Sequence, residues 1–128
     1  MRLTLRLLQD RFSVCRLASA AVLPPELLAA QRDFVSVTRT ADELSVVCPE
    51  DMAPEGSKVQ PGWRAFKVLG PLDFALTGII ASLTAPLAEA QISVFAIATY
   101  DTDYLLVQEK GLAAAKAALA RSCKIEAD

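Results

Sequence analysis

The sequence predicts an α+β fold built from two β-α-β-β units, in which helices cover one face of an antiparallel sheet. Two observations lead to this prediction. The order strand, helix and hairpin occurs twice, and Leu27 and Leu87, like Val47 and Val107, lie 60 positions apart. The stretch 92–98 is apolar on both of its faces, which suits a central strand, or a sheet whose second face meets another sheet or subunit. We therefore expect one unit over residues 1–60 and another over residues 61–128.

The first unit shows three kinds of pattern. Leucines alternate with polar residues near the start, which indicates a half-buried strand. Two prolines then open a short helix, because proline is tolerated in the first turn. A polar connector joins two apolar runs as a hairpin, and a stretch rich in proline and glycine is interpreted as a linker. In chain order the strands are expected at 3–7, 12–17, 34–38 and 43–47, the helix at 24–31 and the linker at 48–62.

The second unit repeats these patterns with longer helices. A strand precedes a helix, two strands form a hairpin, and an alanine-rich helix ends the chain with one apolar face. In chain order we expect strand 63–69, helix 77–90, strands 92–98 and 103–108, and helix 112–123.

Composition excludes several classes of function. The chain has 128 residues, a formal net charge of −2 and no histidine. Without histidine there is no Ser-His-Asp or Cys-His catalysis and no His-ligated zinc. The charge balance carries no basic footprint for nucleic acid, and no apolar run approaches the ~18 residues of a membrane-spanning helix. Three cysteines without CxxC spacing fit buried thiols in a cytoplasmic protein, so we expect no metal and no cofactor.

Two aspartates, Asp101 and Asp103, lie at the second hairpin with spacing i, i+2. In an extended segment this spacing places both carboxylates on the same side, where they can attract a cation together. General acid–base catalysis and oxygen-ligated metals also use such pairs. Aspartates are equally common as turn formers, so the spacing alone leaves a structural role open.

The segment from Gly70 to Ile80 runs from the end of a strand into a helix. Thr77 fits an N-cap, and Gly78 permits close approach to the backbone. The free N–H groups of Gly78, Ile79 and Ile80 would face a ligand there, and the helix dipole favours an anion. Neither a GxGxxG pattern nor a Walker lysine is present, so a nucleotide phosphate is not indicated. A capped helix with a tight entry and no ligand is the alternative.

The two features together predict a ligand class. A helix N-terminus can hold a carboxylate, and a pair of aspartates can hold an ammonium group. These are the two charges of a zwitterion. The sequence therefore favours a free amino acid as the ligand.

Several segments together resemble a known family. They are residues 34–50, Gly70-Pro-Leu-Asp-Phe74, Thr77-Gly-Ile-Ile80, Pro86-Leu-Ala-Glu-Ala90, Ile92-Ser-Val-Phe95 and Thr99-Tyr-Asp-Thr-Asp-Tyr104. Over nearly the whole chain, from about residue 12 to residue 119, the sequence resembles the small bacterial tandem-ACT proteins. That family is similar to the CASTOR-type arginine sensors of animals and to the regulatory ACT domains of aspartate kinases.

The resemblance implies two ferredoxin-like ACT units, a homodimer, and regulation by a small ligand, usually an amino acid. It implies that the second helix start contacts the ligand's carboxylate through the backbone, and that the hairpin contacts its cationic end. Carried over by position, the first set is Thr77, Gly78, Ile79 and Ile80, and the second is Thr99, Tyr100 and Asp103. Asp101 joins them from the spacing argument alone.

The sequence also departs from the family pattern. Gln91 occupies a place where the family commonly has glycine, and Gln31 is its equivalent in the first unit. A left-handed backbone at that place would cost a non-glycine residue on the order of 1 kcal/mol. Pro86 removes a hydrogen bond from the second helix. The first unit has Leu17-Ala18 where the second has Thr77-Gly78, so we expect only the second unit to bind a ligand.

We expect a non-enzymatic, cytoplasmic protein that binds an amino acid or a similar small zwitterion and signals its occupancy to a protein partner. It should have no catalytic residues and should bind neither nucleic acid nor membrane. The alternative is an ACT scaffold or oligomerisation module without a ligand. An enzyme is the least favoured reading, because the available bases are carboxylates and cysteines.

Overall fold

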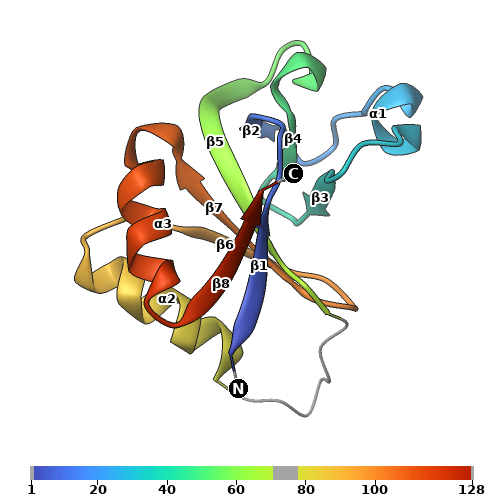
Figure 1. Ribbon diagram of the computed structural model, residues 1–128. Coiled ribbons are helices and arrows are strands. Elements are labelled where there is room, and N and C mark those ends of the chain that lie inside the picture. Colours follow the sequence, from blue (N-terminus) through green and yellow to red (C-terminus); the bar gives the residue numbers. More distant parts are fainter. Residues whose placement is uncertain (1, 71–77, 128) are drawn as a thin grey trace. The chain divides into compact units, whose positions relative to one another are not determined.

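The computed structural model describes residues 2–70 and 78–127. The chain divides into two compact units (Figure 1). One is the continuous segment Asp10–Trp63, which we call the inserted unit. The other combines Met1–Gln9 with Arg64–Asp128, and we call it the discontinuous unit. The sequence assigned residues 1–9 to the first unit, whereas the structure pairs them with strands of the discontinuous unit.

The discontinuous unit is a five-stranded sheet with two helices. Its strands are β1 (Leu3–Leu7), the second half of β5 (Lys58–Val68), β6 (Phe95–Ala98), β7 (Asp103–Gln108) and β8 (Cys123–Ala127). The helices are α2 (Ile79–Glu89) and α3 (Leu112–Ala120), with a short 3-10 turn, η2 (Glu109–Gly111), before α3. The strand order is β8-β1-β5-β7-β6. Without β1, this is the ferredoxin-like order of a β-α-β-β-α-β unit.

The sheet of the discontinuous unit is mixed rather than wholly antiparallel. β1 pairs antiparallel with β5 and parallel with β8. A strand inserted between two neighbours that run in opposite directions must be parallel to one of them, so β1 necessarily introduces one parallel pair. β8 itself was not predicted, because the alanine-rich helix was extended through Cys123. In the structure α3 ends at Ala120, and the alternating pattern Cys-Lys-Ile-Glu-Ala forms the strand.

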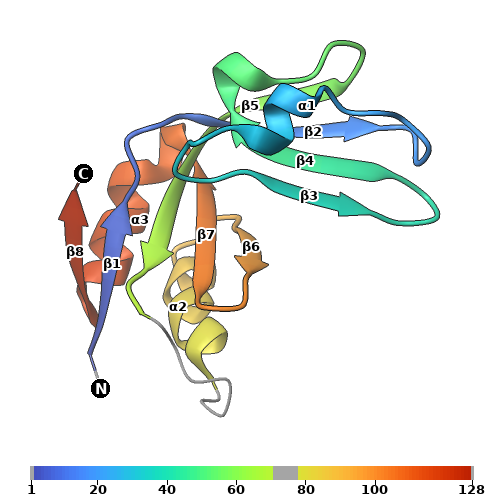
Figure 2. The same ribbon diagram turned by 90° about the vertical axis from the view of Figure 1, so that its right-hand side faces the viewer.

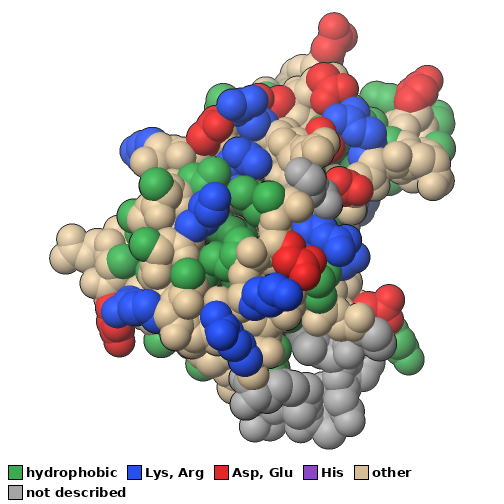
Figure 3. Space-filling view, in the orientation of Figure 1, with side chains coloured by type: hydrophobic (Ala, Val, Ile, Leu, Met, Phe, Trp, Pro, Cys, Tyr) green, Lys and Arg blue, Asp and Glu red, His purple; other side chains and the backbone are tan. Residues whose placement is uncertain are grey.

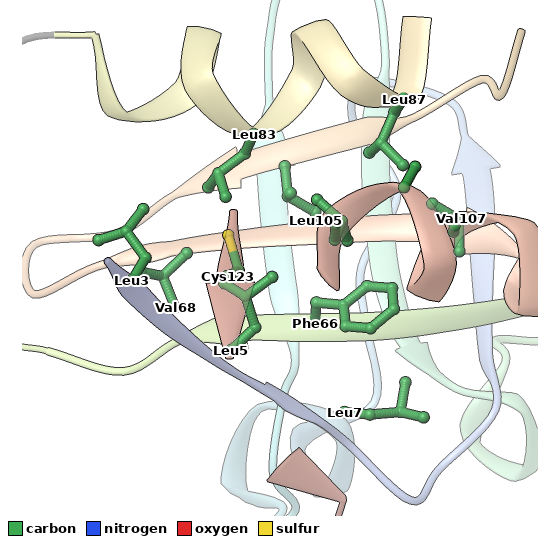
Figure 4. Packing of buried hydrophobic residues seen from close by; sticks show 13 residues of the cluster. Leu3, Leu5, Leu7, Phe66, Val68, Leu83, Leu87, Leu105, Val107 and Cys123 are labelled. Carbon is green, nitrogen blue, oxygen red and sulfur yellow. The ribbon is translucent and has the colours of Figure 1, made fainter. Parts of the chain in front are cut away.

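The core of the discontinuous unit lies between the sheet and its two helices (Figure 4). Alternate residues of β1, β5 and β7 point to the same side, as the period of a strand requires. They pack against apolar residues of α2 and α3, so both helices cover one face, as predicted. The buried cluster is Leu3, Leu5, Leu7, Phe66, Val68, Leu83, Leu87, Leu105, Val107, Ala115, Ala118, Leu119 and Cys123.

The inserted unit is an antiparallel sheet with one short helix (Figure 2). Its elements are β2 (Phe12–Leu17), α1 (Pro25–Ala29), β3 (Ser36–Arg39), β4 (Leu44–Pro49), the 3-10 turn η1 (Glu50–Met52) and the first half of β5. The strand order is β3-β4-β2-β5. The buried cluster that α1 joins through Leu27 also contains Cys15, Leu23, Leu44, Val46 and Cys48.

The stretch interpreted as a linker, residues 48–62, is structured. It contains the end of β4, η1 and the first half of β5. Pro61 is compatible with β5 because the pairing of β2 with β5 is irregular between Phe12 and Val14. Gly62 has a φ of +83° there, and its N–H donates to the Glu50 carboxylate at 2.7 Å. A bulge thus replaces the flexible connection that the proline and glycine content suggested.

Candidate functional site

The helix start and the hairpin that the sequence singled out lie at the same end of the discontinuous unit (Figure 2). The turn between β6 and β7 lies beside the end of β5, because the Thr102 hydroxyl donates to the Val68 carbonyl at 2.6 Å. From Val68 the chain continues towards α2. One topological end of the sheet therefore holds both halves of the expected site.

The start of α2 combines an exposed glycine with two anchored isoleucines. Gly78 is the N-cap residue, with a φ of +75°, and no side chain among the described residues caps the helix. Its carbonyl accepts the Ser82 N–H at 2.9 Å, which begins the helical ladder. Ile79 and Ile80 pack against the core cluster. The sequence placed the N-cap at Thr77, which lies outside the described residues, whereas the N-cap of α2 is Gly78. The backbone N–H groups of the first turn lie at the positive end of the helix dipole.

Two threonines close the β6–β7 hairpin around a two-residue tip. The Thr99 N–H donates to the Thr102 carbonyl at 2.8 Å, and the Thr102 N–H donates to the Thr99 hydroxyl at 3.3 Å. Tyr100 and Asp101 form the tip, where the Tyr100 side chain is 81% exposed. The hairpin is therefore fixed at its base and open at its tip.

The two aspartates occupy different settings. Asp103 begins β7, pairs with Ala98 and is half-buried. It alternates with Leu105 and Val107, which pack under the helices, so its side chain lies on the same face as α2. Asp101 is exposed in the turn rather than in a strand. The i, i+2 argument for a shared side required an extended segment and does not apply to Asp101.

Sequence reasoning missed Thr102, which is only 5% exposed and joins the hairpin to β5. The pattern Thr99-Tyr-Asp-Thr102, with hydroxyls three residues apart around a turn, was the available signal. Threonine side chains at such spacing commonly bond to the backbone of the same turn. The local pattern does not indicate which strand lies beside this turn, so the bond to Val68 could not be predicted from the sequence.

The corresponding end of the inserted unit is built differently. α1 has only five residues, because Pro24 and Pro25 start it late, and it offers no comparable helix N-terminus. The segment before it carries carbonyl oxygens that accept hydrogen bonds from Arg39. Leu17 is the last residue of β2.

The cysteines of the inserted unit are unsuited to nucleophilic chemistry. Cys15 and Cys48 are buried free thiols. Burial raises the pKa of the Cys48 thiol to about 12 and also raises the pKa of Cys15. With this pKa the Cys48 thiol is almost fully protonated at neutral pH. Because only the thiolate is an effective nucleophile, Cys48 is unreactive there. In the part of the chain that the structure describes, no three Cys, Asp or Glu side chains gather as a metal site.

The surface and the helices give two further facts. On the face shown in Figure 3, acidic and basic side chains lie among apolar ones. Within residues 2–70 and 78–127, every helix is too short or too polar to cross a lipid bilayer.

Comparison with known proteins identifies the family. The model of the ACT domain matches residues 58–121, and a model of an N-terminal domain matches residues 10–56. The chain belongs to the ACT domain family. The two matches meet near the start of β5, close to the boundary between the inserted and the discontinuous unit.

Curated relatives of this ACT-domain chain include an animal sensor. It is 40% identical over 80 residues to the human cytosolic arginine sensor for mTORC1 subunit 1, covering 62% of this chain and 24% of the sensor. The bovine protein of the same name is 33% identical over 107 residues, covering 72% of this chain and 31% of the relative. The chain thus spans about a quarter to a third of the length of these relatives.

Solved structures agree with the ACT assignment. A protein of Agrobacterium tumefaciens is 36% identical with a TM-score of 0.89, and the match covers 100% of this chain and 95% of that one. The ligand-free regulatory subunit of aspartate kinase from Thermus thermophilus is 11% identical with a TM-score of 0.62, covering 92% and 95% of the two chains. At that identity the likeness concerns the fold alone.

Proposed function

We propose that this ACT-domain chain is a non-enzymatic regulatory protein of the cytoplasm that binds an amino acid or a similar small zwitterion. One observation carries the proposal: the start of α2 and Asp103 lie at the same end and on the same face of one sheet. The helix start favours a carboxylate, and Asp103 favours an ammonium or guanidinium group. An amino acid with a cationic side chain carries one group for each of these two positions.

The local geometry at each position supports this assignment. Gly78 takes up a left-handed conformation and has no side chain that could keep a small anion from the start of α2. A Cβ built on Gly78 would meet no described atom within 4 Å. Thr99 and Tyr100 at the hairpin complete the proposed set, together with Asp101 and the undescribed Thr77.

The relatives suggest which ligand to test first. The human relative is named as an arginine sensor, and the Thermus relative as a regulatory subunit. Asp103 is half-buried, and an apolar side chain of the ligand would leave its carboxylate without a partner. A cationic side chain therefore suits this position better. L-Arginine and L-lysine are therefore the first ligands to test.

We further propose that the chain acts as a homodimer of tandem ACT units and passes ligand occupancy to a protein partner. The match to the human relative covers 24% of that protein, so the relative contains further sequence beyond the matched part. Pairing with a copy of itself is the commonest way for a chain to form a symmetric oligomer.

Thermal unfolding in the presence of the twenty amino acids tests the binding proposal. A ligand that binds only the folded protein raises its stability by about 2.7 kcal/mol at a concentration of 100 Kd. We expect a concentration-dependent rise in Tm with a basic amino acid. A flat panel, repeated with common nucleotides, would instead support the scaffold that binds no ligand.

The variant Gly78→Val tests the helix start. Valine is strongly disfavoured at positive φ, so the backbone must change where the ligand's carboxylate would bind. We expect loss of the ligand-induced rise in Tm. Gly56→Val is the matched control, because Gly56 has a similar φ of +79° with open space around it but lies in the inserted unit. The proposal fails if both variants lose the ligand response equally.

The variant Asp103→Asn tests the cation position. The substitution keeps the side chain's shape and removes its charge, so binding of L-arginine should weaken by about tenfold while binding of neutral amino acids changes little. Isothermal titration calorimetry measures both affinities. Asp101→Asn, in the exposed turn, serves as the control. An equal loss for neutral and basic ligands would remove the role assigned to Asp103.

A further inference from the structure

The inserted unit bridges its own hairpin and its strand-to-helix segment with an arginine. The guanidinium of Arg39 donates hydrogen bonds to the carbonyl oxygens of Ser19 and Ala21, the latter at 3.0 Å. Both carbonyls belong to residues 18–24, the segment between β2 and α1. That segment is the topological counterpart of the one that leads from β5 into α2.

The register shows that Arg39 occupies a corresponding place. The last residue pair before the hairpin turn is Arg39–Leu44 in the inserted unit and Ala98–Asp103 in the discontinuous unit. Leu44 lies in the core cluster with Leu27 of α1, so the pair faces the helix side of the sheet, as Asp103 does. In the inserted unit this pair carries the guanidinium of Arg39 and the side chain of Leu44. In the discontinuous unit the corresponding pair carries the methyl group of Ala98 and the carboxylate of Asp103.

Neighbouring contacts have the same chemistry. The Ser19 hydroxyl donates to the Thr40 carbonyl, and the Arg16 guanidinium donates to the Asp42 carbonyl at 3.1 Å. Each acceptor is a backbone carbonyl oxygen. A guanidinium supplies several N–H donors in a fixed plane and suits such acceptors, whereas a carboxylate would be repelled by them.

We propose that residues 18–24 form a carbonyl-lined site for a guanidinium group, and that Arg39 is its built-in occupant. In this arrangement Arg39 holds the segment against the β3–β4 hairpin without an external ligand. The inserted unit is thus closed by its own side chain, and removal of that side chain opens a site for small guanidinium compounds. This proposal does not depend on whether the discontinuous unit binds an amino acid.

Amide hydrogen exchange of the full chain tests the proposal with Arg39→Ala. We expect the amides of residues 18–23 to exchange about three- to tenfold faster, because two exposed charge-assisted hydrogen bonds are lost. Millimolar methylguanidinium should return the exchange towards the wild-type rate, and methylammonium at the same ionic strength should not. Arg39→Lys should recover only part of the protection, because its ammonium lacks the planar fork.

Two comparisons separate a local effect from general loosening. The core amides of β2 and β4 should be unchanged in Arg39→Ala. Arg16→Ala removes a neighbouring exposed arginine that bonds to Asp42 instead, and it should leave the 18–24 segment unresponsive to methylguanidinium. The proposal is overturned if exchange in the segment is unchanged in Arg39→Ala, or if methylammonium restores it as well as methylguanidinium does.

Discussion

Gln91 is where the sequence and its backbone conformation disagree most. It has a φ of +61° and follows the last turn of α2. Its N–H donates to the Ala88 carbonyl, and the Ile92 N–H donates to the Leu87 carbonyl, both at 2.9 Å. These two bonds form a Schellman motif, in which the left-handed position is usually glycine. The departure from glycine at Gln91 suggested that the turn differs, whereas the backbone here is left-handed, so Gln91 carries the conformational cost of that position.

Gln91→Gly should stabilise the protein. Glycine removes the clash of a Cβ at positive φ, which stabilises the fold, but it loses more conformational entropy on folding, which offsets part of the effect. The net gain in the free energy of unfolding should be about 0.5–1 kcal/mol. Chemical denaturation measures the change. Gln31→Gly is the control, since Gln31 is exposed and has no positive φ, and it should gain nothing. Equal gains in both variants would contradict the strain argument.

At the residue scale the sequence predicted positions along the chain better than contacts. Gly78 was expected inside the helix, whereas it is the left-handed residue just before it. Asp103 was expected at the start of a strand, and it begins β7. The bonds of Thr102 to Val68 and of Arg39 to Ser19 join residues 34 and 20 positions apart. No local periodicity encodes such pairings, because they depend on how the strands are ordered.

Among the elements, those with long and regular patterns were predicted best. β7 has the predicted bounds, and α2 differs by two residues at its start and one at its end. The errors lie where one signal masked another. Prolines and glycines hid the first half of β5, and the helix-forming alanines of α3 hid the short strand β8. Both hidden strands have polar residues that alternate with apolar ones for too few positions to outweigh their neighbours.

An ion triad links three segments of the inserted unit. The guanidinium of Arg32, between α1 and β3, contacts Asp10 at 3.1 Å and Asp51 of η1 at 3.0 Å. The hydrogen bonds from Arg32 hold the pKa of Asp51 below its ordinary value. The triad holds the segment between α1 and β3 in place, because the five-residue helix α1 is too short to order this segment by itself.

The variant Asp51→Asn tests the triad through pH. Because the folded pKa of Asp51 is depressed, its contribution to stability is present above the unfolded pKa and is lost as pH falls through the folded value. Wild type should exceed Asp51→Asn in stability near pH 6, and the difference should disappear towards about pH 2. Urea unfolding across this range measures it. A difference that persists at the acid end would mean that the asparagine acts through packing instead.

Along the chain, the continuous segment of the inserted unit interrupts the sequence of the discontinuous unit. β1 supplies three buried leucines to the core of the discontinuous unit and pairs with β5 and β8. The sequence predicted β1 itself but not its partners, because the strand lies next to β2 in the chain and its apolar alternation fits either unit. The first unit that the sequence suggested began at residue 1, whereas β1 belongs to the sheet of the discontinuous unit.

Leu5→Ala should therefore destabilise the half of the chain that is farthest from it in sequence. Leu5 is fully buried, and such truncations cost about 2–5 kcal/mol. Hydrogen exchange should increase in β5 and β8. Leu28→Ala, at a side chain that is 64% exposed in α1, should change stability by no more than about 0.5 kcal/mol. Faster exchange confined to β2 and β4 would contradict the assignment of β1.

The position of β1 also sets an order of events during synthesis. Its parallel partner β8 is translated about 120 residues later, after every other element of the chain. The inserted unit has all its strands once β5 has emerged, so it can fold while the edge of β1 that pairs with β8 is still unpaired. Contacts between chain ends so far apart form slowly, because the intervening loop must close first. Folding of the discontinuous unit is thus the last and slowest step, and β1 is the segment most exposed to aggregation until then.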